Sequence, residues 1–232
     1  MSKTIKGLLF DKDGTLFDFQ ATWGVWCAGF IKDVSKEDKT VAKALAKAMD
    51  YDMENEVFFP SSVMITNSMD GIMDAVHSAL PHWDRAALTD YVIETGSKAP
   101  QTPVTELAPL LDKFRARGLK VGLATNDNEV AGRAHLSSVK ILEYFDFVSG
   151  CDSGYGAKPD PGMLLGFADA VGLKPSEIAM VGDSTHDLKA GRAAGMVNIA
   201  VLTGPAVAKD LAPYADVVLQ DISEIPEWLG LD

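Results

Sequence analysis

The sequence predicts an α/β protein built on a doubly wound parallel sheet, with an α-helical domain inserted after the first strand. From residue 105 onward, short apolar segments alternate with helical segments, which is typical of such a sheet. Residues 17–98 lack the alternation of strands, which predicts the helical insertion. We therefore expect a core domain formed by residues 1–16 and 100–232 and an inserted domain formed by residues 17–99.

The first predicted strand, residues 5–10, is short and largely apolar, as expected for a buried parallel strand. Asp11, Asp13 and Gly14 follow it directly, where open α/β sheets bind their ligands. Two carboxylates this close repel each other unless a cation or a proton lies between them. The pair therefore suggests a metal, a shared proton or both. The alternative is a polar turn in which Asp13 and Gly14 only make the bend.

The inserted domain is expected to contain four or five helices, and composition and spacing predict three of them over residues 41–49, 70–80 and 84–94. Ser68 and Asp84 are plausible N-caps. Trp23, Trp26 and Phe30 have helical spacing and are expected in the core of this domain.

The core domain is expected to alternate between strands and helices. Strands are predicted over residues 120–124, 145–149, 178–181, 197–202 and 217–219, and helices over residues 106–117, 129–138, 161–171 and 187–194. Glycines at 118, 172 and 195 follow three of these helices and are expected to end them.

Composition excludes several classes of function. The formal net charge of −12 disfavours binding to nucleic acid or to anionic membranes. No apolar segment reaches the about 20 residues that span a bilayer, and no secretory signal is recognisable. The two cysteines, Cys27 and Cys151, do not make a disulfide framework. We expect a cytoplasmic protein, either a monomer or a homodimer.

Two further groups of polar residues stand out: Thr125 and Asn126 follow the strand over residues 120–124, and Lys158 precedes the helix over residues 161–171. Thr125 and Asn126 offer a hydroxyl, an amide and backbone N–H groups at a helix entrance, a combination suited to phosphate. A plain N-cap is the alternative. Lys158, between a loop and two prolines, offers a compact charge that could neutralise a phosphoryl oxygen or restrain a carboxylate.

The fourth motif begins where the predicted strand over residues 178–181 ends. Asp183 and Ser184 follow the strand, and Asp187 lies in the first turn of the next helix, where it also suits the helix dipole. With Asp11 and Asp13 these carboxylates would make the oxygen-rich site that Mg²⁺ favours.

Taken together, Asp11-x-Asp13-Gly14-Thr15, Thr125, Lys158 and Gly182-Asp183-Ser184-x-x-Asp187 resemble the four motifs of the haloacid dehalogenase (HAD) superfamily. The surroundings of Lys158 and of residues 187–196 resemble its phosphoglycolate-phosphatase-like branch, and the likeness covers essentially the whole chain. This resemblance implies a Rossmann-like core with a helical cap.

By that resemblance, Asp11 is the nucleophile that becomes phosphorylated and Asp13 is the general acid and base. Lys158, Thr125 and Asn126 would bind the phosphate. Asp11, the main-chain carbonyl of Asp13, and Asp183 would hold Mg²⁺. Ser184 and Asp187 would orient metal-bound water without contacting the metal.

The resemblance implies a Mg²⁺-dependent phosphatase acting on a small phosphate ester, with 2-phosphoglycolate as the best single substrate. The presence of Asp13 argues against a dehalogenase, because a halide leaves without a proton. A β-phosphoglucomutase-like phosphomutase and a phosphonate hydrolase are the alternatives.

Two positions depart from the branch: Lys12 replaces an apolar residue, and Asp18-Phe19 stands where Asp-Ser is common. Lys12 is interpreted as pointing away from the site between strands, although it could instead add a cation beside the nucleophile.

Overall fold

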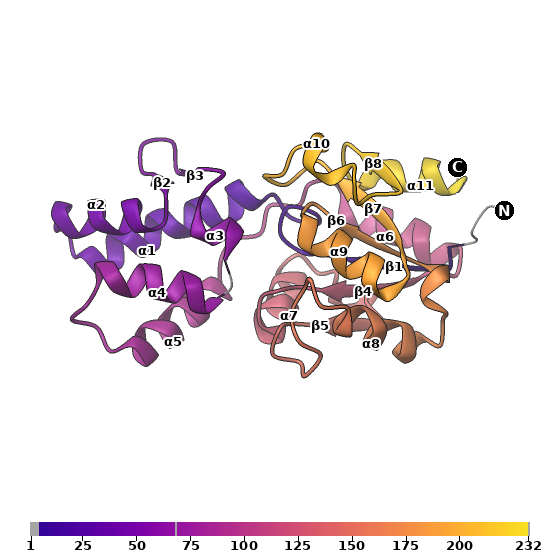
Figure 1. Cartoon of the computed structure of the whole chain (residues 1–232), viewed down its shortest axis with the longest axis horizontal. Coiled ribbons are helices and arrows are strands. Elements are labelled where there is room, and N and C mark those ends of the chain that lie inside the picture. The colour runs from indigo at the N-terminus through magenta and orange to yellow at the C-terminus, as the bar shows by residue number, and fades with distance from the viewer. Residues whose placement is uncertain (1–4, 68, 232) are drawn as a thin grey trace. The chain divides into compact units, whose positions relative to one another are not determined.

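The structure is a computed structural model that describes residues 5–67 and 69–231. The chain forms two compact units. One comprises the residues up to Asp18 and those from Gln101 on, and the other is Phe19–Pro100. Figure 1 shows that the first is built around a sheet and the second around helices. Among the described residues, every helix is too short or too polar to span a lipid bilayer.

The first unit contains one six-stranded sheet in which all neighbouring strands are parallel. Its strands are β1 (Gly7–Phe10), β4 (Lys120–Ala124), β5 (Phe147–Ser149), β6 (Ile178–Gly182), β7 (Val197–Val201) and β8 (Val217–Leu219). Their order is β5-β4-β1-β6-β7-β8. The strands β4 and β5 lie on one side of β1, and the later strands β6, β7 and β8 lie on its other side. Sheets of this kind bind ligands at the point where the strand order reverses, which here is at β1. The predicted Rossmann-like, doubly wound sheet is confirmed.

Helices lie between these strands or, in the case of the last, follow β8. They are α6 (Leu107–Ala116), α7 (Glu129–Ser138), α8 (Gly162–Val171), α9 (Thr185–Ala194), α10 (Ala208–Leu211) and α11 (Ile225–Leu229). The four longer helices agree with the predicted ones to within two residues at each end, and Gly118, Gly172 and Gly195 have positive φ where helices end. The sequence does not predict α10 and α11, because four or five residues are too few to show a helical period.

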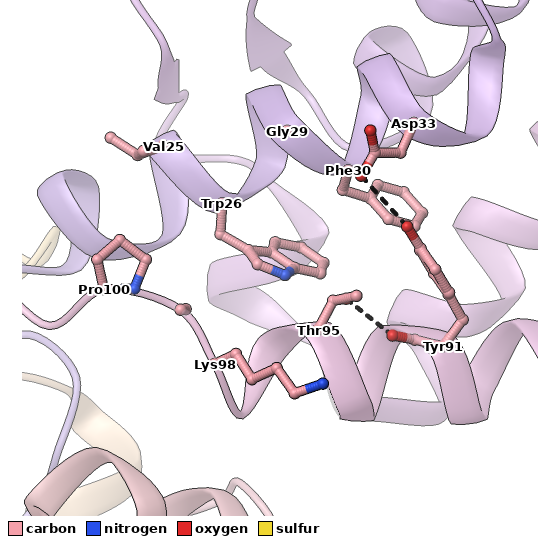
Figure 2. Close-up of a pocket in the computed structure, with 10 residues that line it drawn as sticks. Val25, Trp26, Gly29, Phe30, Asp33, Tyr91, Thr95, Lys98 and Pro100 are labelled. Carbon is pink, nitrogen blue, oxygen red and sulfur yellow. Dashed lines mark hydrogen bonds between the residues drawn. The ribbon is translucent and has the colours of Figure 1, made fainter. Parts of the chain in front are cut away.

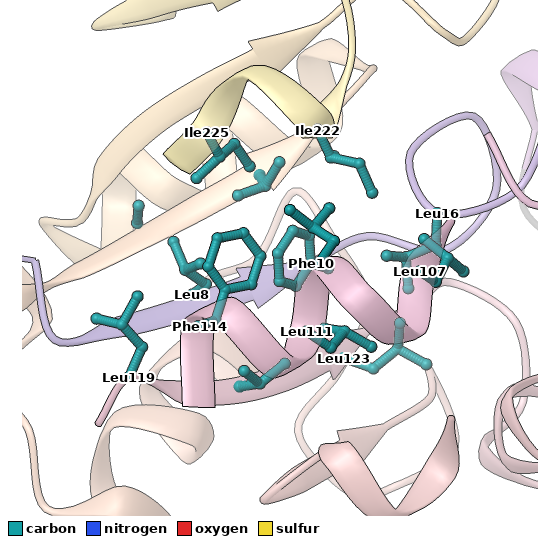
Figure 3. Close-up of a cluster of buried hydrophobic side chains, with 14 of the residues drawn as sticks. Leu8, Phe10, Leu16, Leu107, Leu111, Phe114, Leu119, Leu123, Ile222 and Ile225 are labelled. Atoms are coloured by element: carbon teal, nitrogen blue, oxygen red, sulfur yellow. The ribbon is translucent and has the colours of Figure 1, made fainter. Parts of the chain in front are cut away.

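Side chains of β1 alternate between two apolar clusters, one on each face of the sheet. Leu8 and Phe10 pack in the cluster that includes Leu111 and Phe114 of α6 (Figure 3). Leu9 belongs to a separate cluster with residues of α8 and α9. All three β1 side chains are fully buried, and burying each is worth about 1.5–3 kcal/mol. Strong packing on both faces holds the end of β1, and with it Asp11, in a fixed place.

In its described residues, 19–67 and 69–100, the second unit contains five helices, a π-helical turn over Gln20–Gly24 and a small hairpin. The helices are α1 (Val25–Ser35), α2 (Lys39–Ala48), α3 (Val63–Thr66), α4 (Met69–Ala79) and α5 (Arg85–Gly96), and the hairpin pairs β2 (Tyr51–Asp52) with β3 (Val57–Phe58). The hairpin differs from the expectation that this region lacks strands, because two residues per strand are too few for visible alternation. Asp84 caps α5 by accepting from Ala87 N–H, as predicted, whereas Ser68 lies outside the described residues.

Aromatic side chains form much of the core of the second unit. Trp23, Trp26 and Phe30 are buried there, as predicted. The rings of Trp26 and Phe30 stack with centroids 5.2 Å apart. Beside them lies a cavity of about 190 Å³, which Tyr91 also lines while its hydroxyl donates to Asp33 (Figure 2). This volume is below the about 300 Å³ at which small-molecule sites usually begin, and the lining residues all belong to this unit.

Candidate active site

Three neighbouring strands end level with one another, and a predicted site residue follows each end. Asp11 follows β1, Thr125 follows β4 and Asp183 follows β6. The register aligns Phe10 of β1 with Val181 of β6, and Asp11 N–H extends the ladder by donating to Val181 O at 2.8 Å. The fold thus gathers at one edge of the sheet residues that are up to 172 positions apart in the chain.

Lys158 lies at the centre of this group. Its Nζ is 2.5 Å from Asp11 Oδ1, 2.7 Å from Asp187 Oδ1 and 2.7 Å from the Ala124 carbonyl oxygen. An ammonium has three N–H donors, and these three acceptors match them. The side chain is 2% exposed. The buried Lys158 ammonium therefore bridges the end of β4, the Asp11 carboxylate and the first turn of α9.

Asp187 is held at both of its carboxylate oxygens. Oδ1 pairs with Lys158, and Oδ2 accepts from the backbone N–H of Ser184 at 3.0 Å and from its hydroxyl at 2.6 Å. The Ser184 side chain in turn caps α9. This capping box begins the helix and fixes Asp187 in one orientation. Both predicted residues are thus at the site, with Asp187 facing Lys158.

Asp183 sits in a narrow space between two glycines. A Cβ on Gly14, whose φ is +77°, would lie 2.5 Å from Asp183 Oδ2, and a Cβ on Gly204 would overlap the same carboxylate. The Thr15 hydroxyl donates to Asp183 Oδ1 at 3.3 Å, and the Thr203 hydroxyl donates to the Gly14 carbonyl at 2.6 Å.

Sequence reasoning did not assign a site role to Thr203 and Gly204. The available signal was their position just after β7, the strand beside β6, because that end lies on the same edge of the sheet.

Thr125 and Asn126 begin the loop after β4. The Thr125 hydroxyl accepts from Asp127 N–H at 3.1 Å, which leaves its own proton available to donate. The Asn126 side chain contacts the backbone of Lys158. Its amide donates to the Lys158 carbonyl at 3.0 Å, and its oxygen accepts from Lys158 N–H at 2.9 Å. Asn126 thereby fixes the backbone that carries the central lysine.

Lys12 differs from the interpretation that it points away from the site. Its side chain is fully buried, and its Nζ lies 2.7 Å from Asp13 Oδ2 and 2.8 Å from Asp127 Oδ2. His135 Nδ1, on α7, lies 2.9 Å from the same ammonium. The second cation of the site therefore reaches the second aspartate of the first motif.

Burial and neighbouring carboxylates together set the electrostatics of the site. Burial, followed by the charge of Asp187, raises the pKa of Asp11 to about 7 against the opposing effect of Lys158. Burial, followed by the charges of Asp11 and Asp187, raises the pKa of Asp183 well above its usual range. Burial opposes the charged form of Lys158, but the two facing carboxylates outweigh it and raise the pKa of this lysine.

These carboxylates fit a divalent metal ion. Oxygen atoms of Asp11, Asp183 and Asp187 lie within 4.8 Å of one another, and Mg²⁺ takes hard oxygen ligands. Lys158 supplies one positive charge against three carboxylates. The raised pKa values of Asp11 and Asp183 follow first from burial and then from neighbouring negative charge, and a bound cation would relieve both effects. The close approach of Gly14 and Gly204 to Asp183 restricts where its carboxylate oxygens lie.

Comparison with known proteins identifies the family of the chain. A family model of haloacid dehalogenase-like hydrolases matches residues 5–195. The chain is 35% identical to phosphoglycolate phosphatase of Escherichia coli (strain K12) over 127 residues, which is 54% of this chain. That alignment spans about half the length of the relative, 50%. Phosphoglycolate phosphatase of Salmonella typhimurium is 26% identical over 238 residues, covering 99% of this chain and 94% of the relative.

Solved structures show the same fold. CbbY from Rhodobacter sphaeroides, solved in complex with phosphate, superposes with a TM-score of 0.69 at 18% identity, covering 96% of each chain. HAD phosphatase from Thermococcus onnurineus gives a TM-score of 0.67 at 20% identity, covering 98% of this chain and 99% of that one. The match over residues 5–195, with the motif residues gathered at one edge of the sheet, shows that this chain belongs to the family of haloacid dehalogenase-like hydrolases.

Proposed function

We propose that this chain is a Mg²⁺-dependent phosphatase that hydrolyses a small phosphomonoester through a phosphorylated Asp11. The observation that supports this most is the contact of Asp11 with the buried Lys158, beside the two carboxylates of Asp183 and Asp187. A carboxylate held at the carboxyl-terminal edge of a parallel sheet, next to a fixed cation, is suited to attack phosphorus. The relatives named as phosphoglycolate phosphatases make phosphate esters the natural class of substrate.

In the first step, a carboxylate oxygen of Asp11 forms a bond to phosphorus while the bond to the substrate's alkoxide oxygen breaks. Asp13 gives its proton to that alkoxide, which leaves as an alcohol. Lys158 and the Thr125 hydroxyl stabilise the charge on the phosphoryl oxygens. A positioned acid of this kind contributes about 10²–10⁴ in rate.

In the second step, water attacks the phosphorus of the aspartyl-phosphate. Asp13, now a carboxylate, takes a proton from that water, and the bond between phosphorus and Asp11 breaks. Inorganic phosphate leaves, and both aspartates return to their starting states. The same residue thus serves as acid and then as base, which requires that its carboxyl oxygen stay near the bridging position throughout.

We assign the metal site to the Asp11 carboxylate, the Asp13 carbonyl and the Asp183 carboxylate. When bound, Mg²⁺ supplies charge neutralisation of the transferring phosphoryl group. Both oxygens of Asp187 already have protein partners, which favours a role in orienting the surroundings of the metal over direct ligation. Asn126 positions Lys158 by its side chain and can offer its backbone to phosphate.

The preferred substrate is 2-phosphoglycolate, since the relatives above carry that activity in their names. The unit Phe19–Pro100 is proposed to be the cap that selects among substrates. Phosphate release from para-nitrophenyl phosphate, with and without Mg²⁺, tests the activity, and a panel of metabolite phosphates ranked by kcat/KM tests the substrate. Metal-dependent release of inorganic phosphate supports the proposal. A panel silent with Mg²⁺ present would contradict it, and transfer of phosphate to sugar would indicate a phosphomutase.

A further inference from the structure

Lys12 is a fully buried lysine with no role in the steps above. It directly follows the proposed nucleophile, and its ammonium contacts Asp13, Asp127 and His135. Burying an ammonium costs several kcal/mol unless partners compensate. At the end of this strand an apolar side chain would fill the space without that cost, so the charge calls for an explanation.

The contacts of Lys12 account for its charge. Asp13 Oδ2 and Asp127 Oδ2 form ion pairs with its Nζ at 2.7 Å and 2.8 Å, and His135 Nδ1 lies at hydrogen-bond distance, 2.9 Å. Because the ammonium can only donate, His135 Nδ1 accepts and the imidazole proton resides on Nε2. Asp127 follows β4, and His135 lies on α7, so Lys12 links β1 to a neighbouring strand and its helix.

The two carboxylate oxygens of Asp13 are in different situations. Oδ2 is held by Lys12 at 2.7 Å. Oδ1 is buried and has no hydrogen-bond partner among the residues that the structure describes. A buried polar atom without a partner is uncommon and needs a reason. With Oδ2 engaged by Lys12, Oδ1 is the carboxyl oxygen of Asp13 that has no protein partner among the described residues.

We propose that Lys12 is a positioning residue, which holds Asp13 through Oδ2 so that Oδ1 exchanges the proton with the leaving group and with water. The inference rests on the proposed phosphatase function and deepens it. Without Lys12, the terminal torsion of Asp13 is broad and roughly two-fold, so the carboxyl group would often present the wrong oxygen or none. Asp127 and His135 also contact the Lys12 ammonium and restrict its position.

The test uses substrates whose leaving groups differ in their need for a proton. An alkyl phosphate expels an alkoxide, which must be protonated, whereas para-nitrophenolate leaves without help. The quantity measured is kcat/KM, which covers the steps up to cleavage of the ester bond. Lys12→Met should lower kcat/KM about 100-fold on the best alkyl phosphate and under about 3-fold on para-nitrophenyl phosphate, since positioned acid catalysis is typically worth about 10²–10⁴.

Two further variants serve as a backup and as a control for this test. Lys12→Gln keeps a side-chain N–H donor without the charge, so it should show the same selectivity with a smaller loss, and it serves if Lys12→Met does not fold. Lys120→Met is the matched control, because Lys120 pairs with Asp146 on the same sheet, with its side chain 48% exposed. This control should leave both substrates unaffected.

A double-mutant cycle then separates positioning through Asp13 from any other role. In an Asp13→Asn background, adding Lys12→Met should change kcat/KM less than about 3-fold, because residues that act as a unit are not additive. An equal loss on both substrates, no loss at all, or multiplicative losses in the cycle would overturn the inference.

The outcomes also separate this inference from the proposed function. Selective loss in Asp13→Asn without selective loss in Lys12→Met overturns the role of Lys12 alone. A wild-type protein that releases no phosphate from any ester overturns the proposed function itself.

Discussion

Nζ of Lys158 lies 2.5 Å from Oδ1 of Asp11 and is held there by two further acceptors. Because the cation is fixed before substrate arrives, it costs no reorganisation when charge develops on the phosphoryl group. Lys158→Met should therefore lower kcat by about 10²-fold or more, the loss typical of removing one preorganised donor. The measurement is steady-state phosphate release at saturating substrate. Lys174→Met, a change outside the site, is the control, and an unchanged kcat in Lys158→Met would contradict this role.

A second prediction follows from the close approach of Gly14 and Gly204 to the Asp183 carboxylate. Gly204→Ala would place a methyl group on the Asp183 carboxylate and displace a proposed metal ligand. We expect the Mg²⁺ concentration for half-maximal activity to rise about 10-fold or more, as for disturbed metal surroundings in general. Calorimetric titration with Mg²⁺ checks the same shift without relying on activity.

Gly118→Ala is the matched control for that change. Gly118 has a φ of +74°, but a Cβ there meets nothing within 4 Å. This variant should lose about 1–2 kcal/mol of stability from the strain of a left-handed backbone while Mg²⁺ affinity stays at the parent value. If both alanine variants weaken Mg²⁺ binding equally, crowding at Asp183 is not the cause.

Asn126 should act through Lys158. Asn126→Ala removes two hydrogen bonds to the backbone of Lys158, each worth about 1 kcal/mol net. We expect unfolding at lower denaturant and a clear drop in kcat per folded molecule, measured by combining urea titration with activity assays.

Asn128→Ala provides the comparison. Asn128 caps α7 by accepting from Ala131 N–H, and losing a cap costs about 1 kcal/mol. Its stability should fall by a similar amount with kcat intact. A drop in kcat shared by both variants would mean that general loosening of the loop, and not the position of Lys158, is responsible.

The two cysteines should react at different rates. Cys27 is fully buried, and burial raises the pKa of its thiol, so little thiolate forms at neutral pH. The pKa of Cys151 is also raised by burial, but its side chain is partly accessible. Timed alkylation followed by mass spectrometry should modify Cys151 first and Cys27 only in denaturant. Equal rates in the folded protein would contradict the packing of the helical unit.

Much of the sheet was predictable because each strand is a continuous apolar segment followed by a polar turn. Residues 120–124 and 217–219 were predicted with the bounds that β4 and β8 have. Longer helices were predictable from their period and from glycines at their ends. The β2–β3 hairpin, α10 and α11 were not, since each is too short for a pattern to show.

The site was predictable to the extent that it follows strand ends. Asp11, Thr125 and Asp183 could be placed together because parallel strands share an edge. The partners of individual atoms could not be predicted. Lys12 was interpreted as pointing away, and its contact with Asp13 depends on the position of α7, which no local pattern in the sequence reveals. Asn126 likewise meets the backbone of a residue 32 positions on.

Replacing the proposed nucleophile gives the most direct test of the whole account. Burial raises the pKa of Asp11 to about 7, so its charged form is disfavoured in the fold. A neutral Asn should therefore leave thermal stability in metal-free buffer at or above that of the parent. With Mg²⁺ present, phosphate release from para-nitrophenyl phosphate by Asp11→Asn should fall to background. A folded Asp11→Asn variant that releases phosphate as fast as the parent would contradict the account.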